Sequence, residues 1–276
     1  MRTLVHLSDL HFGRVDPRIL PPLLATVAAA KPDLVVISGD FTQRARVQEF
    51  KDAAWFLANL PQPQLLVPGN HDVPLYDVMR RWLAPLRRYR RYITDDLTPF
   101  YADEEIAVLG INTARALTFK NGRINRAQLA SITERFANFG PRVARIVVTH
   151  HPFDTPALAP GVRPVHGVVG RADLAIAGLL QSRVDMILSG HLHLSHVGQT
   201  AQRYPTHGRA ALLIQAGTAT STRQRDDLNA FNIIRIARPK ADVACMIWDG
   251  EQMTFSQASI EHFVEKEAGW DRLGTT

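Results

Sequence analysis

The chain has 276 residues, of which 46% are hydrophobic and 21% charged, a composition typical of globular proteins and unlike that of disordered or fibrous chains. No apolar run approaches the roughly 20 residues that cross a bilayer, and the apolar start is too short for a secretory signal, so we expect no membrane span and a cytoplasmic location. The single cysteine, Cys245, excludes an internal disulfide and a thiolate metal site, while the net charge of +6 suits an anionic substrate or nucleic acid.

Short apolar runs alternate with helical patterns through the first two hundred residues, an order that implies a largely parallel sheet. Strands are predicted at 3–8, 33–38, 65–68, 106–111, 145–149 and 184–189, and helices at 20–30, 49–60, 126–137 and 171–181. Further along, strands predominate and predict a second, more antiparallel sheet, at 210–217, 231–237, 243–250 and 253–259. Residues 152–170, with four prolines and three glycines, are expected to form a loop at the wall of a site.

An arginine-rich segment lies at 79–93. Its six arginines interleave with Trp82, Tyr89 and Tyr92, a mixture that can bind nucleic acid by charge and stacking. Apolar residues also recur there at helical spacing, so we favour an amphipathic helix with a solvated basic face, kinked at Pro85, over a nucleic-acid site. The positions expected on the apolar face are Met79, Trp82, Leu83, Leu86, Tyr89 and Ile93.

Polar side chains follow five of the predicted strands, each at the point where the strand ends. The carboxyl ends of parallel strands are where open α/β sheets place their ligands, so we expect these side chains to meet at one edge. Each motif alone is weak, but their joint occurrence in this order disfavours a purely structural explanation. They are Asp9 and His11, Gly39-Asp40, the sequence GNHD at 69–72, His150-His151-Pro152, and Gly190-His191-Leu192-His193.

The last of these motifs lies in the stretch SGHLHLSHV, residues 189–197. On an extended backbone, His191 and His193 share one face and the leucines share the other, where His196 also falls. A half-buried strand that exposes polar residues is the alternative to a metal site. The other four motifs favour metal binding by His191 and His193, with His196 as a bystander.

In this order the motifs D-x-H, G-D, G-N-H-D, H-x-P and G-H-x-H, over residues 9–193, resemble those of the calcineurin-like metallophosphoesterase superfamily. The resemblance implies an α/β fold, a four-layer αββα sandwich, in a single domain over 1–276, and we expect residues 196–260 to form mainly strands of the second sheet. It also implies two divalent metal ions, bridged by Asp40. Their other ligands would be Asp9, His11 and His193 for one ion, and Asn70, His150 and His191 for the other.

The chemistry agrees with this arrangement. Two ions roughly 3.5–4 Å apart hold a hydroxide between them and clamp the phosphoryl oxygens for in-line attack. Nitrogen and oxygen ligands without thiolate suit Mn, Fe, Zn or Co. His150 is preferred to His151 because the family's ligand lies two residues before the proline. His71 matches the family's general acid, which Asp72 would orient, while His6 and His166 are expected to be structural or exposed.

The second motif, GDFTQRA, resembles the bacterial class III cyclic-nucleotide phosphodiesterases and related glycerophosphodiesterases more than protein phosphatases or repair nucleases. The expected function is therefore metal-dependent hydrolysis of small phosphodiesters, cyclic nucleotides or similar. A nuclease or phosphomonoesterase on the same site is the first alternative. A catalytically inactive protein-binding scaffold is less favoured, because every expected ligand is present. The natural substrate, the metal identities and homo-oligomerisation stay open.

Overall fold

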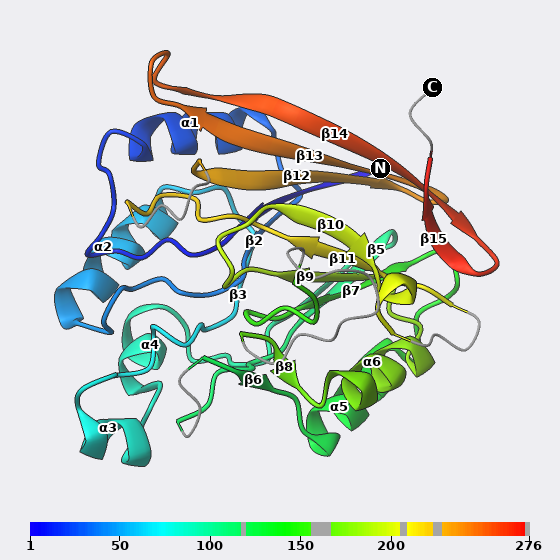
Figure 1. Cartoon of the computed structure of the whole chain (residues 1–276), viewed down its shortest axis with the longest axis horizontal. Helices are drawn as coiled ribbons and strands as arrows, with labels where there is room; N and C mark the ends of the chain where they lie inside the picture. The colour runs from blue at the N-terminus through cyan, green and yellow to red at the C-terminus, as the bar shows by residue number, and fades with distance from the viewer. Residues whose placement is uncertain (117–119, 156–166, 205–208, 223–227, 274–276) are drawn as a thin grey trace.

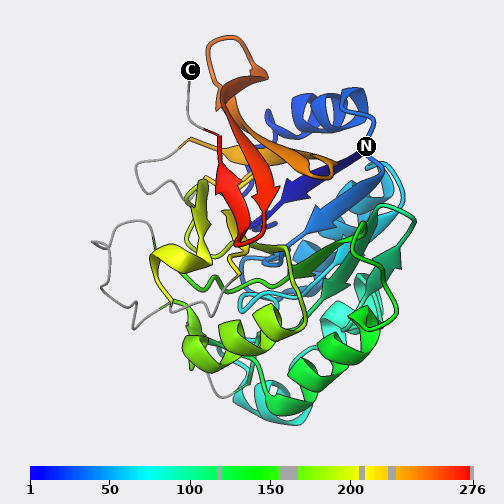
Figure 2. The same cartoon turned by 90° about the vertical axis from the view of Figure 1, so that its right-hand side faces the viewer.

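The computed structural model describes residues 1–116, 120–155, 167–204, 209–222 and 228–273. Two mixed sheets pack face to face, with helices on the outer side of each (Figures 1 and 2). The helices are α1 (Leu20–Ala29), α2 (Val47–Ala58), α3 (Val78–Leu83), α4 (Arg87–Tyr92), α5 (Arg126–Phe136) and α6 (Ala172–Gln181). No helix within the described ranges has the length and apolarity needed to cross a membrane.

The first sheet has seven strands in the order β15-β14-β13-β12-β1-β2-β3, and the second has six in the order β10-β11-β9-β7-β5-β4. The first comprises β1 (Arg2–Leu7), β2 (Leu34–Ile37), β3 (Gln64–Leu66), β12 (Ala230–Ala237), β13 (Lys240–Asp249), β14 (Thr254–Lys266) and β15 (Gly269–Arg272). The second comprises β4 (Phe100–Ala102), β5 (Ile106–Gly110), β7 (Ala144–Val148), β9 (Met186–Ser189), β10 (His196–Gln199) and β11 (Leu212–Gln215). A small separate ladder pairs β6 (Gly122–Arg123) with β8 (Val169–Gly170).

The core lies in three layers. Between the sheets, Leu4 and Val36 of the first pack with Ile146 and Leu188 of the second. Outside the first sheet a second apolar cluster packs against α1 and α2, and outside the second sheet a third packs against α5 and α6. This confirms the predicted four-layer αββα fold.

The strands are distributed between the two sheets differently from the prediction. The antiparallel strands β12–β15 do not form a sheet of their own, because β12 pairs with β1, with Val5 opposite Ile233. The parallel strands are divided instead, with β1–β3 in the first sheet and β5, β7 and β9 in the second. Short strands that are buried on both faces have the same apolar pattern whichever partner they take, so the pattern predicts strands but not pairing.

The segment 79–93 also differs from the single kinked helix that was predicted. It forms two short helices, α3 and α4, separated at Ala84, whose backbone angles of φ −155° and ψ 65° are not helical. The residue before a proline is driven out of the helical region, which here resets the helical phase rather than merely kinking the axis. Leu86 and Tyr89 are buried as predicted, but Met79, Trp82 and Leu83 are exposed.

Candidate metal centre

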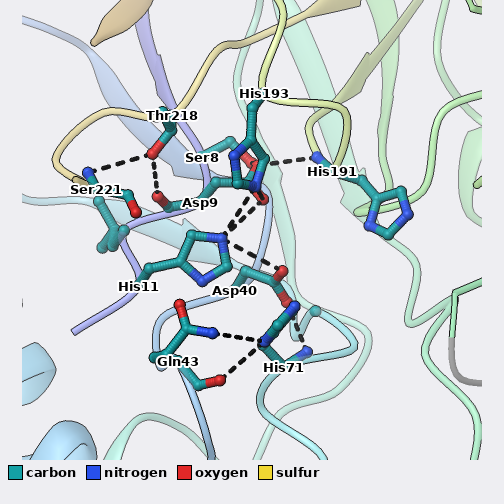
Figure 3. A network of polar contacts seen from close by, with 12 residues as sticks. Ser8, Asp9, His11, Asp40, Gln43, His71, His191, His193, Thr218 and Ser221 are labelled. Carbon is teal, nitrogen blue, oxygen red and sulfur yellow. Dashed lines mark hydrogen bonds and ion pairs between the residues drawn. The ribbon is translucent and has the colours of Figure 1, made fainter. Parts of the chain in front are cut away.

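The site forms where the carboxyl ends of strands from both sheets meet. Asp9, His11 and Asp40 follow β1 and β2, whose loops are joined by the Asp9 amide donating to the Gly39 carbonyl at 3.1 Å. On the second sheet, the Gly190 amide donates to the His150 carbonyl at 3.0 Å and so ties the loop after β9 to that after β7. The two sheets are connected by the His191 amide, which donates to Oδ2 of Asp9 at 2.8 Å (Figure 3).

Five of the seven predicted metal ligands have a left-handed backbone, although none is glycine. Such residues are uncommon and tend to mark sites where the surrounding structure imposes the conformation. Their side chains are brought into the space between the loops instead of continuing the strand alternation. They are Asp9 (φ 51°), His11 (φ 48°), Asp40 (φ 54°), His191 (φ 73°) and His193 (φ 62°).

One donor set consists of Asp9, His11 and His193. Nε2 of His193 lies 3.3 Å, and Nε2 of His11 3.5 Å, from Oδ1 of Asp9. The two imidazole Nε2 atoms lie only 3.1 Å apart. The other carboxylate oxygen, Oδ2, already accepts from the Ser8 hydroxyl at 2.6 Å, whereas Oδ1 is buried with no hydrogen-bond partner.

A second donor set consists of Asn70, His150 and His191. Nε2 of His150 lies 3.0 Å from Oδ1 of Asn70 and 3.2 Å from Nδ1 of His191. The other ring nitrogen of His150, Nδ1, donates to the Ser38 carbonyl at 2.8 Å, so Nε2 carries the lone pair that a metal needs. The ring of His191 points away from the first set, while its amide faces Asp9 (Figure 3).

Asp40 lies between the two sets. Its Oδ2 is 3.8 Å from Nε2 of His11 and 3.4 Å from Nε2 of His150, while Oδ1 accepts from the His71 amide at 2.8 Å. Burial lowers the pKa of the His150 imidazole, but the facing Asp40 carboxylate outweighs this and raises it to about 9. The field of the carboxylates therefore favours a positive charge at this position.

His71 lies beside these sets, with its ring 4.9 Å from that of His11. Nδ1 of His71 donates to the backbone carbonyl of Gln43 at 2.8 Å, and the Gln43 side chain lies 3.5 Å away (Figure 3). Gln43 is thus an orienting residue that the sequence argument missed. Every residue has a backbone carbonyl, so the residue type at position 43 does not reveal this contact. The motif GDFTQRA, which contains Gln43, did indicate that loop.

Asp72, which was expected to orient the His71 ring, lies between the loops that follow β2 and β3. Its carboxylate accepts hydrogen bonds from Gly69, Phe41 and Thr42, at 2.9–3.3 Å. Burial and the nearby Asp40 charge raise the pKa of Asp72 to about 7. Asp72 holds together the loops that follow β2 and β3, so it positions His71 through the backbone.

The remaining histidines have separate environments. His6 is buried with Nε2 2.9 Å from the Ser38 hydroxyl, and burial lowers its pKa to about 3, which fits the structural role expected for it. His151 is also buried, with Nδ1 2.8 Å from the Thr113 hydroxyl and its ring 4.7 Å from that of His191. His166 lies outside the described residues. His196 lies on β10, outside the candidate metal-binding groups of the described chain.

These donors fit divalent cations. Imidazole nitrogens lie 3.1 and 3.2 Å apart within the two sets, and Asp9 adds a buried carboxylate oxygen without a hydrogen-bond partner, so a positive charge among these atoms would stabilise them. Two of the four His/Asp groups able to hold an ion are Asp9-His11-His193 and Asp9-Asp40-His150. The other two groups are His11-Asp40-His71 and His150-His151-His191.

A sequence model of the calcineurin-like phosphoesterase family matches residues 2–195, most of the chain. The chain belongs to the calcineurin-like phosphoesterase family.

Among similar proteins, the glycerophosphodiester phosphodiesterase GpdQ of Enterobacter lignolyticus is 34% identical over 80 residues, covering 25% of this chain and 29% of that protein. The UDP-2,3-diacylglucosamine pyrophosphatase LpxG of Chlamydia muridarum is 34% identical over 76 residues, 26% of this chain and 23% of that protein. The match thus spans less than a third of either relative. A purple acid phosphatase from yellow lupin shares the fold, with a TM-score of 0.67 at 10% identity over 93% of this chain and 52% of that one.

Proposed function

We propose that the protein is a dinuclear metal-dependent phosphodiesterase that acts on small phosphodiesters, cyclic nucleotides or similar. The observation that carries the proposal is the position of Asp40, whose Oδ2 faces a histidine of each donor set, His11 at 3.8 Å and His150 at 3.4 Å. A shared carboxylate is the usual means of holding two cations close together against their mutual repulsion.

In this proposal Asp9, His11 and His193 hold one cation, Asn70, His150 and His191 the other, and Asp40 both. When bound, the cations neutralise the phosphoryl oxygens and activate water for in-line attack. The protein's own contribution is to fix the ligands through Ser8, Ser38 and the left-handed backbone.

His71 would protonate the leaving oxygen. The Gln43 carbonyl accepts a hydrogen bond from Nδ1, so in this proposal the proton is transferred from Nε2. His71 belongs to neither proposed ligand set, although it lies close enough to His11 and Asp40 to ligate. Its role is therefore tested separately from metal binding.

Small diesters are favoured as substrates by the GDFT motif and by the relative named as a glycerophosphodiesterase. The relative named as a pyrophosphatase supports a second candidate, hydrolysis of a nucleotide-linked pyrophosphate. Cytoplasmic location and binding of Mn or Fe remain part of the proposal.

The test is a substrate panel with added Mn, comparing cyclic AMP, bis(4-nitrophenyl) phosphate, 4-nitrophenyl phosphate, a nucleotide-linked pyrophosphate and single-stranded DNA. We expect diesters to be hydrolysed faster than the corresponding monoester. A clear preference for the monoester, or strong exonuclease activity, would assign the site to the alternative functions. Fastest turnover of the pyrophosphate would favour the second candidate.

A further inference from the structure

Helix α3 presents apolar side chains to solvent and buries an arginine. Arg81 is only 4% exposed, and its guanidinium donates to the carbonyls of Ala116 and Pro74 at 2.6 and 3.0 Å. The apolar side chains of the same helix point the other way, because positions 78, 79, 82 and 83 lie on one helical face. This inverts the usual arrangement of a surface helix.

Five large side chains form what we call the exposed apolar face, and each is at least 61% exposed. They lie within eight consecutive residues, whereas the other large exposed apolar residues of the described chain are scattered over other elements. A contiguous exposed cluster of this kind marks an interaction site more often than isolated apolar residues do. The exposed apolar face consists of Tyr76, Val78, Met79, Trp82 and Leu83.

Basic residues border this face. Residues 76–93 contain six arginines against one aspartate, a net charge of +5, and that aspartate, Asp77, pairs with Arg80 at 2.7 Å. The exposed arginines of α4 line a hollow of about 790 Å³ together with Leu83 and Asp95, which pairs with Arg90 at 3.4 Å, so the apolar surface continues into a mainly basic one. We call Arg87, Arg90 and Arg91 the basic margin.

We propose that the exposed apolar face and the basic margin dock the protein on an anionic phospholipid bilayer. Trp and Tyr prefer the interface between headgroups and acyl chains, and apolar residues beside arginines are typical of helices that lie in that interface. The face is carried by α3, which lies at the lower left edge of the molecule (Figure 1).

Charge argues against a second copy of the chain as the occupant. In a two-fold dimer through this face, the same patch of each copy meets the other, so the two basic margins would repel one another. The anionic headgroups of a bilayer instead attract them.

The exposed apolar face also adjoins the candidate metal centre. The Arg44 guanidinium lies over the Tyr76 ring, 5.6 Å from its centroid, and Arg44 follows the Gln43 that holds His71. Membrane docking is independent of the proposed hydrolysis and is measured without turnover.

The test is sedimentation of the full chain with vesicles, either phosphatidylcholine alone or an equal mixture with phosphatidylglycerol. We expect binding to the anionic vesicles, at least about tenfold weaker after Met79→Ser, Trp82→Ser and Leu83→Ser together. The matched control makes the same replacements elsewhere, Met253→Ser, Trp55→Ser and Leu174→Ser, at residues that are also exposed. This control variant should bind like the wild type.

Two further readouts complete the test. Reversal of the basic margin, with Arg87, Arg90 and Arg91 all changed to Glu, should weaken binding to anionic vesicles, as should added salt. Tryptophan emission should shift to the blue on binding in the wild type but not in Trp82→Phe.

Absence of vesicle binding, or equal binding to neutral vesicles, would overturn the proposal. So would a wild-type dimer that the triple-serine variant converts to monomer, since the occupant would then be a second copy.

Discussion

His71 lies at the candidate metal centre, where Nδ1 of its ring donates a hydrogen bond to a backbone carbonyl. Nδ1 is held by the backbone carbonyl of Gln43, a partner that no side-chain substitution removes directly. The Asp72 carboxylate, in turn, holds the loop through Gly69, Phe41 and Thr42. The ring is thus positioned by backbone atoms on two sides, which suits a group that transfers a proton at a defined point.

We therefore expect His71→Ala to slow hydrolysis of cyclic AMP by a factor of about 10²–10⁴, the usual value of general acid catalysis. An alkoxide leaving group needs protonation, whereas a nitrophenolate does not, so the loss on bis(4-nitrophenyl) phosphate should be much smaller. Rates on both substrates and metal content measure this. The exposed His262 provides the control, and His262→Ala should leave both rates unchanged.

Two outcomes would contradict this role. Equal losses on both substrates with unchanged metal content would mean that His71 positions the phosphate instead of donating a proton. Loss of metal would make His71 a ligand, in agreement with its proximity to His11 and Asp40, and the proposed ligand sets would then be wrong.

At the level of elements, the site depends on loops that approach one another more closely than side chains allow. A Cβ atom at Gly69 would lie 2.1 Å from Oδ1 of Asp40 and 2.3 Å from its amide nitrogen. The loop after β3 can thus pack on the loop after β2 only with glycine at this position.

Gly69→Ala should consequently displace Asp40 and reduce both metal content and activity, the latter by about 10²-fold, as displacements of about 1 Å in an active site do. Gly140→Ala is the matched control, because no atom lies within 4 Å of a Cβ built there. Wild-type metal content in Gly69→Ala would show that the two loops can separate without loss of the site.

The elements that were predicted best are those whose signal is local. Apolar runs identified the strands, and the polar residues at their ends do converge, as the 2.8 Å bond from the His191 amide to Asp9 demonstrates. Strand pairing was not predictable, because β1 is buried on both faces and its pattern does not distinguish β2 from β12 as neighbours. The buried face of α3 was predicted wrongly for another reason. The apolar periodicity was followed through Ala84, where the backbone leaves the helical region and separates α3 from α4.

Across the whole molecule, a buried ionic cluster joins the two sheets at the edge opposite the metal centre. Asp185, at the amino end of β9, accepts from Arg238 at 3.0 and 3.1 Å and from Nε1 of Trp270 at 3.3 Å. Arg238 lies between β12 and β13, and Trp270 lies on β15, so the cluster fixes the first sheet against the second.

Asp185→Ala should lower the free energy of unfolding by about 1–3 kcal/mol, because it removes a buried acceptor from Trp270 and from Arg238, which keeps its ion pair with Glu265. Activity per folded molecule should remain near that of the wild type, since the proposed ligands His191 and His193 lie beyond the other end of β9. Urea denaturation measures the first expectation, and Lys266→Ala, which removes an exposed pair with Asp271, should have a much smaller effect. A variant as stable as the wild type would show that the sheets are held together without this cluster.

Metal content is the most direct test of the central claim, that one carboxylate joins two cation sites. The wild type, Asp40→Ala and Asn70→Ala would each be loaded with excess Mn, freed of unbound metal and analysed by mass spectrometry for ions per chain. We expect two ions in the wild type, loss of both in Asp40→Ala, and loss of mainly one in Asn70→Ala. A single ion in fully active wild-type protein, or retention of both in Asp40→Ala, would contradict it.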